Sequence, residues 1–248
     1  MKNLKGSFCL QQDFLSNTEL FFSDKISNNQ IILDGEEFHH CINVMRHSLN
    51  DEIYVTNGCG KIYLSKISTV SKKELTLEIF KSFEYGNKFQ NIFLCFPNLK
   101  SNERMEFAIE KCVELGITNF IIYKSDFSFN KGNKISRWEK ISISAMKQSL
   151  RAWKPKITLS ESFQALLKSE GDKIIFNQEA DLIFNRQYLE NYVFNDTKNK
   201  FLVIGPEGGF SQKELILVEH ELKAKLTGNR LRSETAIISI AILLNQFL

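Results

Sequence analysis

The strongest candidate for chemistry is a sharp bend built around one carboxylate. Residues 205–209 read Gly-Pro-Glu-Gly-Gly and follow an apolar run, Phe201 to Ile204, that is typical of a buried strand. Glycine lets the backbone adopt positive φ and approach a ligand closely, while Pro206 fixes one dihedral angle. Ligands of open α/β sheets bind beyond the carboxyl ends of the strands, so Glu207 is expected at a ligand. A plain tight turn is the alternative.

A second candidate lies near the C-terminus. Residues 226–236 read Leu-Thr-Gly-Asn-Arg-Leu-Arg-Ser-Glu-Thr-Ala and precede an apolar run expected to be a helix. The guanidinium groups of Arg230 and Arg232 suit recognition of phosphate or carbonyl oxygen atoms. Glu234 stands at the positive end of the expected helix, where Ser233 would be a good N-cap. Glu234 is therefore either a catalytic carboxylate or part of the helix cap.

Three basic clusters complete the candidates. Lys100 and Arg104 open one expected helix, Gln148 and Arg151 end another, and Arg46 follows the pair His39-His40. Solvated charge at a helix end is the alternative for each cluster. Adjacent histidines on a helix point in two directions, which makes a poor metal site.

Composition places the chain among globular proteins with a mild positive charge. The 248 residues are 43% hydrophobic and carry a net charge of +3, which is weak support for a polyanionic partner. The five cysteines form no Cys-x-x-Cys pair, so neither a zinc site nor a disulfide framework is expected. The sequence shows no signal-peptide run and no stretch apolar enough to cross a membrane, so we expect a cytoplasmic location.

The sequence has two regions that differ in their predicted secondary structure. Short strands and turns predict a small β-rich domain over residues 1–81, with Asn57-Gly58 as a hairpin signal, followed by a polar linker over 82–90. Strands and helices then alternate over 91–248, which predicts an α/β fold with a parallel sheet. The expected strands are 53–56, 61–67, 75–80, 91–96, 120–123, 173–176 and 201–204, and the expected helices are 101–115, 138–150, 214–223 and 235–247.

Taken together, the clusters resemble the ribosomal RNA small subunit methyltransferase E family, of the SPOUT class of knotted methyltransferases. The matching motifs keep the family's order: His39-His40 with Val44-Met45-Arg46; Arg104-Met105-Glu106 with Lys111 and Glu114-Leu115-Gly116; Gln148 and Arg151 with Pro155; residues 205–209; and Leu231 to Ala236. Asn50 stands where the family usually has Gly, and Asn tolerates the left-handed conformation that this turn needs. Thr227 also departs from the family's usual Leu-Gly, and Ser233 from its usual Thr.

The resemblance implies a PUA-like β-barrel, then a SPOUT methyltransferase domain whose C-terminal segment threads a trefoil knot. It implies S-adenosylmethionine as the donor and N3 of one uridine in 16S ribosomal RNA, in an assembled small subunit, as the target. It also implies a homodimer, with no metal and no membrane. The positions implied to bind the cofactor are Asn177, Ile204, Gly205, Glu207, Gly208, Gly209, Leu226, Gly228, Asn229 and Leu231. The RNA-binding candidates are Arg46, Lys100, Arg104, Gln148 and Arg151.

The chemistry needs a base, or cations that stabilise charge on the uracil oxygen atoms, because N3 is a poor nucleophile while protonated. Arg232 is the candidate for the charge, and Glu234 or Glu207 either accepts the proton or orients the arginine. A Rossmann methyltransferase is disfavoured because Pro97 to Lys100, after the first strand of the α/β region, contains no glycine. There are two competing hypotheses: a non-catalytic RNA-binding protein, and a methyltransferase that acts on another RNA position.

Overall fold

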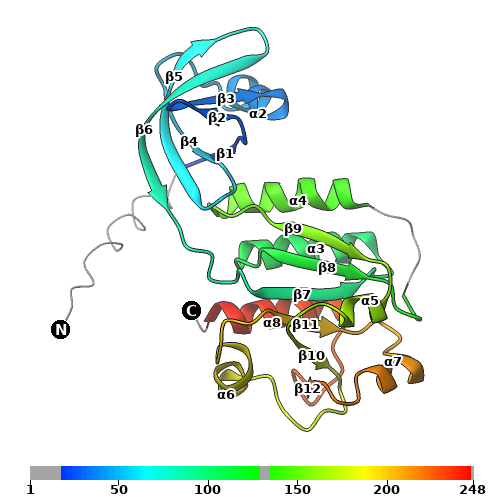
Figure 1. Cartoon of the computed structure of the whole chain (residues 1–248). Helices are drawn as coiled ribbons and strands as arrows, with labels where there is room; N and C mark the ends of the chain where they lie inside the picture. Colours follow the sequence, from blue (N-terminus) through cyan, green and yellow to red (C-terminus); the bar gives the residue numbers. More distant parts are fainter. Residues whose placement is uncertain (1–17, 129–133, 247–248) are drawn as a thin grey trace, which may run out of the picture. The chain divides into compact units, whose positions relative to one another are not determined.

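The structure, a computed structural model, describes residues 18–128 and 134–246. It divides into two compact units (Figure 1). The β-rich unit is made of Met1–Gly86 together with Lys147–Trp153, and the α/β unit of Asn87–Met146 together with Lys154–Leu248. Cys9 and Phe247, the last residue of an expected helix, lie outside the described residues.

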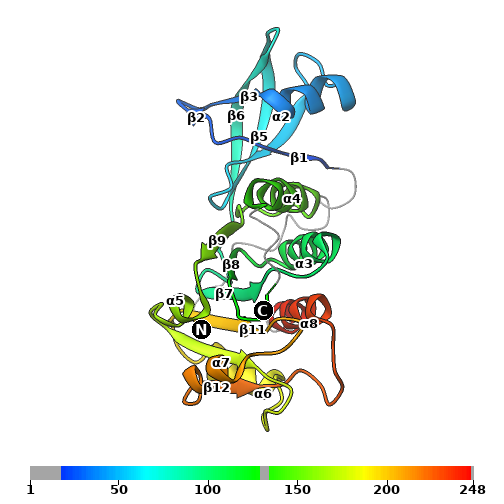
Figure 2. The ribbon, with the colours of Figure 1, turned by 90° about the vertical axis from the view of Figure 1, so that its right-hand side faces the viewer.

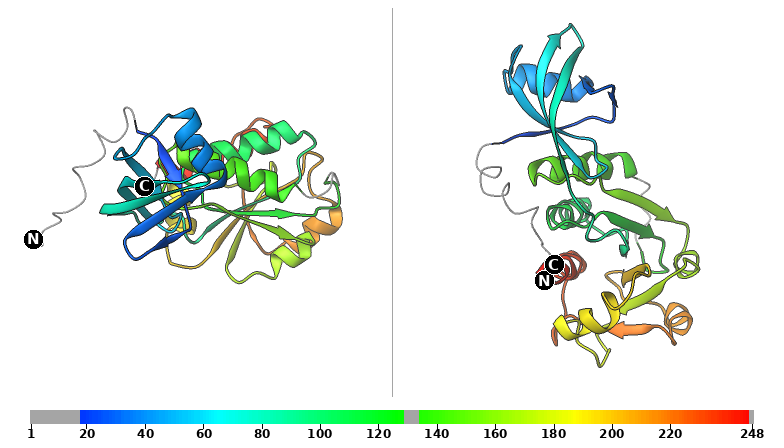
Figure 3. Two further views of the ribbon diagram at one scale, coloured as in Figure 1. Left: turned by 90° about the horizontal axis from the view of Figure 1, so that it is seen from above. Right: turned by 60° about the vertical axis from the view of Figure 1, so that its left-hand side comes forward.

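The β-rich unit is built on a six-stranded sheet with the order β1-β4-β5-β6-β3-β2. The strands are β1 (Leu20–Phe22), β2 (Ile26–Ser27), β3 (Gln30–Asp34), β4 (Glu52–Thr56), β5 (Lys61–Val70) and β6 (Glu74–Glu84). The expected hairpin at Asn57-Gly58 is confirmed, since β4 and β5 pair antiparallel across it. The long strands β5 and β6 form a second antiparallel pair (Figure 3). β6 continues through residues 82–84, the start of the segment expected to be a linker.

Helical turns α2 (Gly35–His39) and η1 (His40–Val44) follow β3 and carry the histidine pair. The core beneath them contains Phe21, Leu33, Cys41 and Val55, all at most 1% exposed. Asn50 has φ of +76°, so the left-handed turn expected at this position is confirmed.

The segment Lys147–Trp153 belongs to the β-rich unit, although the sequence-based boundaries place it in the C-terminal domain. The amide of Gly60 donates to the carbonyl of Ala152 at 2.9 Å. The indole N–H of Trp153 donates to the carbonyl of Tyr85 at 2.8 Å. These partners lie far away in sequence, which is why the boundary cannot be seen in a linear pattern.

The α/β unit contains a wholly parallel six-stranded sheet with the order β12-β10-β11-β7-β8-β9, as the alternation of strands and helices predicts. Its strands are β7 (Ile92–Pro97), β8 (Asn119–Tyr123), β9 (Lys156–Ser160), β10 (Asp172–Phe176), β11 (Lys200–Ile204) and β12 (Leu222–Ala224). Helices α3 (Asn102–Glu114), α4 (Ile135–Gln148) and α8 (Ser233–Gln246) lie on one face, and α5 (Phe163–Leu167) on the other (Figure 2). The remaining helical elements are α6 (Arg186–Tyr188), η2 (Leu189–Val193) and α7 (Gln212–Leu217).

Helix ends and packing follow the sequence pattern in this unit. Gly116, with φ of +98°, ends α3 in the left-handed conformation that its place in the pattern predicts. Helix α8 is apolar on nearly all sides and packs against both α3 and β11. Its residues Ile237, Ile240 and Leu244 are completely buried. These contacts keep the apolar side chains of α8 out of water, as a helix that is apolar on nearly all sides requires.

One expected element is wrong in its second half. The pattern over 214–223 predicts a helix, but α7 ends at Leu217 and the chain then forms β12. Residues Leu222 to Ala224 pair in parallel with Ile174 to Phe176 of β10. This tertiary pairing overrides local helix propensity at Leu222 and Lys223, the two strand residues that lie within the expected helix. The elements that the sequence pattern did not predict are β1, β2, β3, α2, η1, β9, α5, α6 and η2. No helix within residues 18–128 and 134–246 is long and apolar enough to span a membrane. The trefoil knot stays a prediction.

Candidate active site

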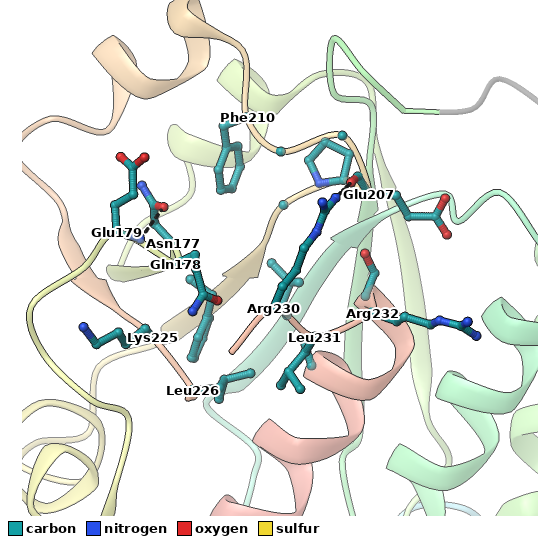
Figure 4. A pocket seen from close by; sticks show the side chains of 18 of the residues that line it. Asn177, Gln178, Glu179, Glu207, Phe210, Lys225, Leu226, Arg230, Leu231 and Arg232 are labelled. Carbon is teal, nitrogen blue, oxygen red and sulfur yellow. Dashed lines mark hydrogen bonds between the residues drawn. The ribbon is translucent and has the colours of Figure 1, made fainter. Parts of the chain in front are cut away.

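A cavity of about 710 Å³ opens where three adjacent parallel strands end. Because β12, β10 and β11 are neighbours in the sheet, the loops that follow them meet at one edge (Figure 4). The lining residues are Arg104, Phe176, Asn177, Gln178, Glu179, Ile204, Gly205, Pro206, Glu207, Gly208, Gly209, Phe210, Leu215, Ala224, Lys225, Leu226, Arg230, Leu231, Arg232, Ser233 and Ala236. Its volume is within the usual range for small-molecule sites.

The cavity brings together most of the residues expected to bind the cofactor. Gly208 of the first bend and Leu231 of the second both line it, although they are far apart in sequence. Of the expected cofactor residues, only Gly228 and Asn229 do not line it, and both are exposed members of the same 226–231 loop.

The bend after β11 depends on its glycines for two different reasons. A Cβ on Gly205 would lie 2.9 Å from the ring of Phe210, so glycine allows this ring to lie against the strand end. Gly209 has φ of +80°, and its amide donates to the carbonyl of Pro206 at 2.8 Å. The first glycine therefore supplies space and the second a left-handed backbone.

A hydrogen-bond network fixes the far side of this bend. Ser211 and Glu214 form a reciprocal capping box at the start of α7. The Oε1 atom of Glu214 also accepts from the amide of Asp126 at 3.1 Å, and the Ser211 hydroxyl donates to the Asp126 carboxylate at 2.6 Å. Glu214 is only 3% exposed, so this carboxylate is structural and holds the loop after β8 against the bend.

The opposite wall is held by contacts between the loops after β10 and β12. The amide of Asn177 donates to the carbonyl of Ala224 at 3.0 Å, and Gln178 Nε2 donates to the carbonyl of Thr227 at 2.9 Å. Asn177 Oδ1 accepts from the amide of Glu179 at 3.1 Å. The 226–231 loop is therefore tied to β10 despite the departure from the family pattern at Thr227.

Charged side chains gather at the end of the cavity next to α3 and α8. Arg104 Nε lies 3.4 Å from Glu234 Oε1, and Arg104 Nη1 lies 4.0 Å from Glu207 Oε1. The Glu207 and Glu234 side chains are 24% and 12% exposed. Glu207 lines the cavity, whereas Glu234 does not. The structure thus joins both expected catalytic carboxylates to Arg104, which the sequence assigns to RNA.

Arg230 and Arg232 are placed differently. The Arg230 side chain reaches across the bend, and its Nη2 donates to the carbonyl of Glu207 at 3.4 Å (Figure 4). Arg232 lines the cavity and is exposed. Its guanidinium makes no hydrogen bond or ion pair with any other described residue. Helix α8 begins at Ser233, and the carbonyl of Arg232 accepts from the amide of Ala236 at 2.9 Å, so the N-cap position falls on Arg232 and not on Ser233.

The expected RNA-binding residues are divided between the two units. Arg46, Gln148 and Arg151 belong to the β-rich unit, and Lys100 and Arg104 to the α/β unit. Burial lowers the pKa of Arg151 from its ordinary value. Among these five residues, only Arg104 lines the cavity.

Several cavity residues were not singled out as site residues from the sequence. Gln178 and Glu179 come just after β10, Lys225 directly follows β12, and Phe210 follows the glycine bend. Their position after a strand was the available signal, but the first two residues of β12 were expected to be helical. The described part of the chain contains no group of three or more His, Cys, Asp or Glu side chains that could hold a metal ion.

Comparison with known proteins agrees with this architecture. A family model for an RNA methyltransferase domain matches residues 87–245, and a model for an RNA methyltransferase PUA domain matches residues 33–80. Fold and cavity thus correspond to the class of RNA methyltransferases with a PUA domain.

Ribosomal RNA small subunit methyltransferase E of Aquifex aeolicus is 31% identical over 92% of this chain and 99% of its own length. A probable rRNA-methyltransferase of Porphyromonas gingivalis, of known structure, is 26% identical, with a TM-score of 0.77 over 92% of this chain and 98% of its own. The Neisseria gonorrhoeae methyltransferase E, solved bound to S-adenosyl methionine, is 23% identical and shares the fold, with a TM-score of 0.79 over 93% of this chain and 98% of its own. The chain belongs to the ribosomal RNA small subunit methyltransferase E family, and the family expected from the ordered motifs is confirmed.

Proposed function

We propose that the protein transfers a methyl group from S-adenosylmethionine to N3 of one uridine in 16S ribosomal RNA. The observation that carries this proposal is the single cavity that unites the 205–209 bend with the 226–231 loop. Membership of the methyltransferase E family supports ribosomal RNA as the substrate. The relative from Neisseria gonorrhoeae, solved with S-adenosyl methionine, supports the identity of the donor.

The residues present fit such a donor. Gly208 and Gly209 are exposed at the cavity and leave the backbone of the bend open to a ligand. Ile204, Leu226 and Leu231 provide apolar surface, and the neighbouring loop backbone provides the polar groups that an adenine edge requires. When bound, the donor supplies the methyl group, whose bond to sulfur breaks while its bond to N3 forms.

The chain's own contribution is alignment and charge. Arg232 is exposed at the cavity, so its guanidinium is available to stabilise negative charge that develops on the uracil oxygen atoms. Glu207 or Glu234 either accepts the N3 proton or orients the arginine. The target base must leave its stack to reach these groups. Arg46 and Arg151 of the β-rich unit, with Lys100, are the proposed phosphate contacts.

We further propose a cytoplasmic homodimer that acts on the assembled small subunit, with a trefoil knot formed by the C-terminal segment. Sedimentation of the purified protein tests the dimer. Methyl transfer to free 16S RNA compared with assembled subunits tests the form of the substrate.

The decisive experiment has two parts. Calorimetric titration with S-adenosylmethionine is expected to show one site per chain, and absence of binding would favour a non-catalytic RNA-binding protein. Mapping of 16S RNA from a deletion strain is expected to show loss of one N3-methyluridine, restored with the gene. A methylated uridine that persists after deletion would refute the proposed target.

A further inference from the structure

The charged group beside the cavity is drawn from three separate elements. Arg104 comes from the first turn of α3, Glu207 from the bend after β11, and Glu234 from the first turn of α8. The two carboxylates and one guanidinium leave a formal charge of −1 within this group. One carboxylate is therefore not neutralised by the arginine.

Geometry separates the two carboxylates. Glu234 lies nearer to Arg104, at 3.4 Å from Nε, whereas Glu207 lies 4.0 Å from Nη1, beyond hydrogen-bond distance. Both carboxylates have a buried oxygen with no hydrogen-bond partner among the described residues, Glu234 Oε2 and Glu207 Oε1, but only Glu207 lines the cavity, where a ligand can reach it. A buried acceptor left open is costly, so a donor from a bound ligand is expected to meet it. Glu207 lines the cavity, and Glu234 stands behind it.

We propose that these three residues divide their roles: Glu207 accepts the N3 proton, Arg104 positions Glu207, and Glu234 holds Arg104. This inference rests on the proposed function and assigns the roles that function leaves open. The N3–H bond breaks, its electron pair stays on nitrogen, and a new O–H bond forms on Glu207. The proton later passes from the carboxyl group to water.

Arg104 is accordingly a positioning residue and not a phosphate contact. Its side chain is 41% exposed, but its guanidinium faces two carboxylates of its own chain. A phosphate that approached Arg104 would be repelled by both of these carboxylates. The uracil edge suits the arrangement better, because its N–H donor is flanked by carbonyl acceptors.

The test compares Glu207→Gln, Glu234→Gln, Arg104→Gln and Arg104→Lys with wild type on two RNAs. One 16S RNA carries uridine and the other 5-fluorouridine, whose electron-withdrawing fluorine makes N3 more acidic. Each RNA is used in the form, free or assembled, on which wild type is active.

Glu103→Gln is the matched control, since Glu103 is exposed on α3 and lies outside the cavity. Donor affinity, RNA affinity at several salt concentrations and thermal melting are measured alongside kcat.

Glu207→Gln is expected to lower kcat at least about 100-fold on uridine RNA, the usual range for removal of a general base. On 5-fluorouridine RNA the loss of kcat should be at least about tenfold smaller, because the fluorinated uracil loses its N3 proton more readily without a general base. Arg104→Gln lowers kcat without changing RNA affinity or its salt slope, and Arg104→Lys recovers part of the loss. Glu234→Gln behaves like Arg104→Gln but more weakly.

Three results would overturn the inference. The first is a Glu207→Gln deficit that is equal on both RNAs, which would mark a structural role. The second is a larger, fluorine-sensitive deficit for Glu234→Gln, which would make Glu234 the base. The third is an Arg104→Gln variant whose salt slope falls by about 1 with unchanged kcat, which is the signature of a phosphate contact. Wild-type protein that methylates no uridine would instead refute the proposed function itself.

Discussion

The hydroxyl of Tyr123 donates a hydrogen bond of 2.7 Å to the carbonyl of Ile204, and this bond ties the end of β8 to the last residue of β11. Tyr123 is 2% exposed, and burial raises its pKa well above the ordinary value, so the hydroxyl remains a donor at alkaline pH. The bend that carries Glu207 therefore starts from a fixed point.

Tyr123→Phe is expected to lower the unfolding free energy by about 1–3 kcal/mol, because a buried carbonyl loses its partner. Affinity for S-adenosylmethionine should fall as well, which calorimetry would measure. Tyr192→Phe is the control, since the Tyr192 hydroxyl makes no hydrogen bond with other described residues. An equal loss of stability in both variants would contradict the role given to the Tyr123 bond.

The same tyrosine predicts a pH dependence. Its pKa is raised in the folded state, so its contribution to stability is fully present below the unfolded-state value, about pH 10, and is lost at higher pH. Denaturant unfolding at a series of alkaline pH values should show a steeper fall for wild type than for Tyr123→Phe. Parallel curves would mean that Tyr123 does not carry the effect.

Gly205→Ala is expected to weaken donor binding more than it weakens the fold. Its new Cβ would lie 2.9 Å from the Phe210 ring, and this ring also lines the cavity. Combining it with Phe210→Leu should restore part of the lost affinity, as measured by calorimetry. If the double variant simply sums the two losses, the clash is not the cause.

The neighbouring glycines should behave differently from each other. Gly209→Ala is expected to cost about 1–2 kcal/mol of stability because its φ is +80°. Gly208 has no such φ, and its added Cβ would meet Phe127 Cβ at 3.4 Å, so Gly208→Ala should change stability less. Thermal melting of the two variants beside Gly228→Ala, where a Cβ would meet open space, checks the order.

Cysteine reactivity offers a test of the two cores. In a Cys9→Ser background at pH 8, iodoacetamide should modify Cys59, which is exposed, and spare Cys41, Cys95 and Cys112, which are buried. Burial raises the pKa of Cys41 to about 12, which suppresses its reactive thiolate. Rapid labelling of Cys41 in the native protein, read by mass spectrometry, would contradict the packing of the β-rich unit.

The sequence is informative wherever local chemistry decides the structure. The positive φ of Asn50 and Gly116 and the glycine bend after β11 follow from residue type and place in the pattern. The capping box of Ser211 and Glu214 also has a local signature, Ser followed three residues later by Glu before an apolar run, but this signature was not used and the expected helix begins at residue 214.

The sequence does not show which distant residues the sheet brings close together. β12 has only three residues and exists because β10 lies beside it, so a local helix pattern was misleading. The nearness of Arg104 to both carboxylates arises because α3, α8 and the end of β11 meet in space. The assignment of Arg104 to RNA was reasonable for a helix-end cation, and only its neighbours suggest another role.

The parallel order β12-β10-β11 has a consequence for how the protein comes into being. The walls of its cavity are contributed by stretches that leave the ribosome at different moments, because the 226–231 loop is made after all six strands of the sheet. A nascent chain that ends after β12 would contain every strand of the sheet but would lack the loop that closes the cavity. Competence for the reaction is thus gained only after the sheet that supports it has been made.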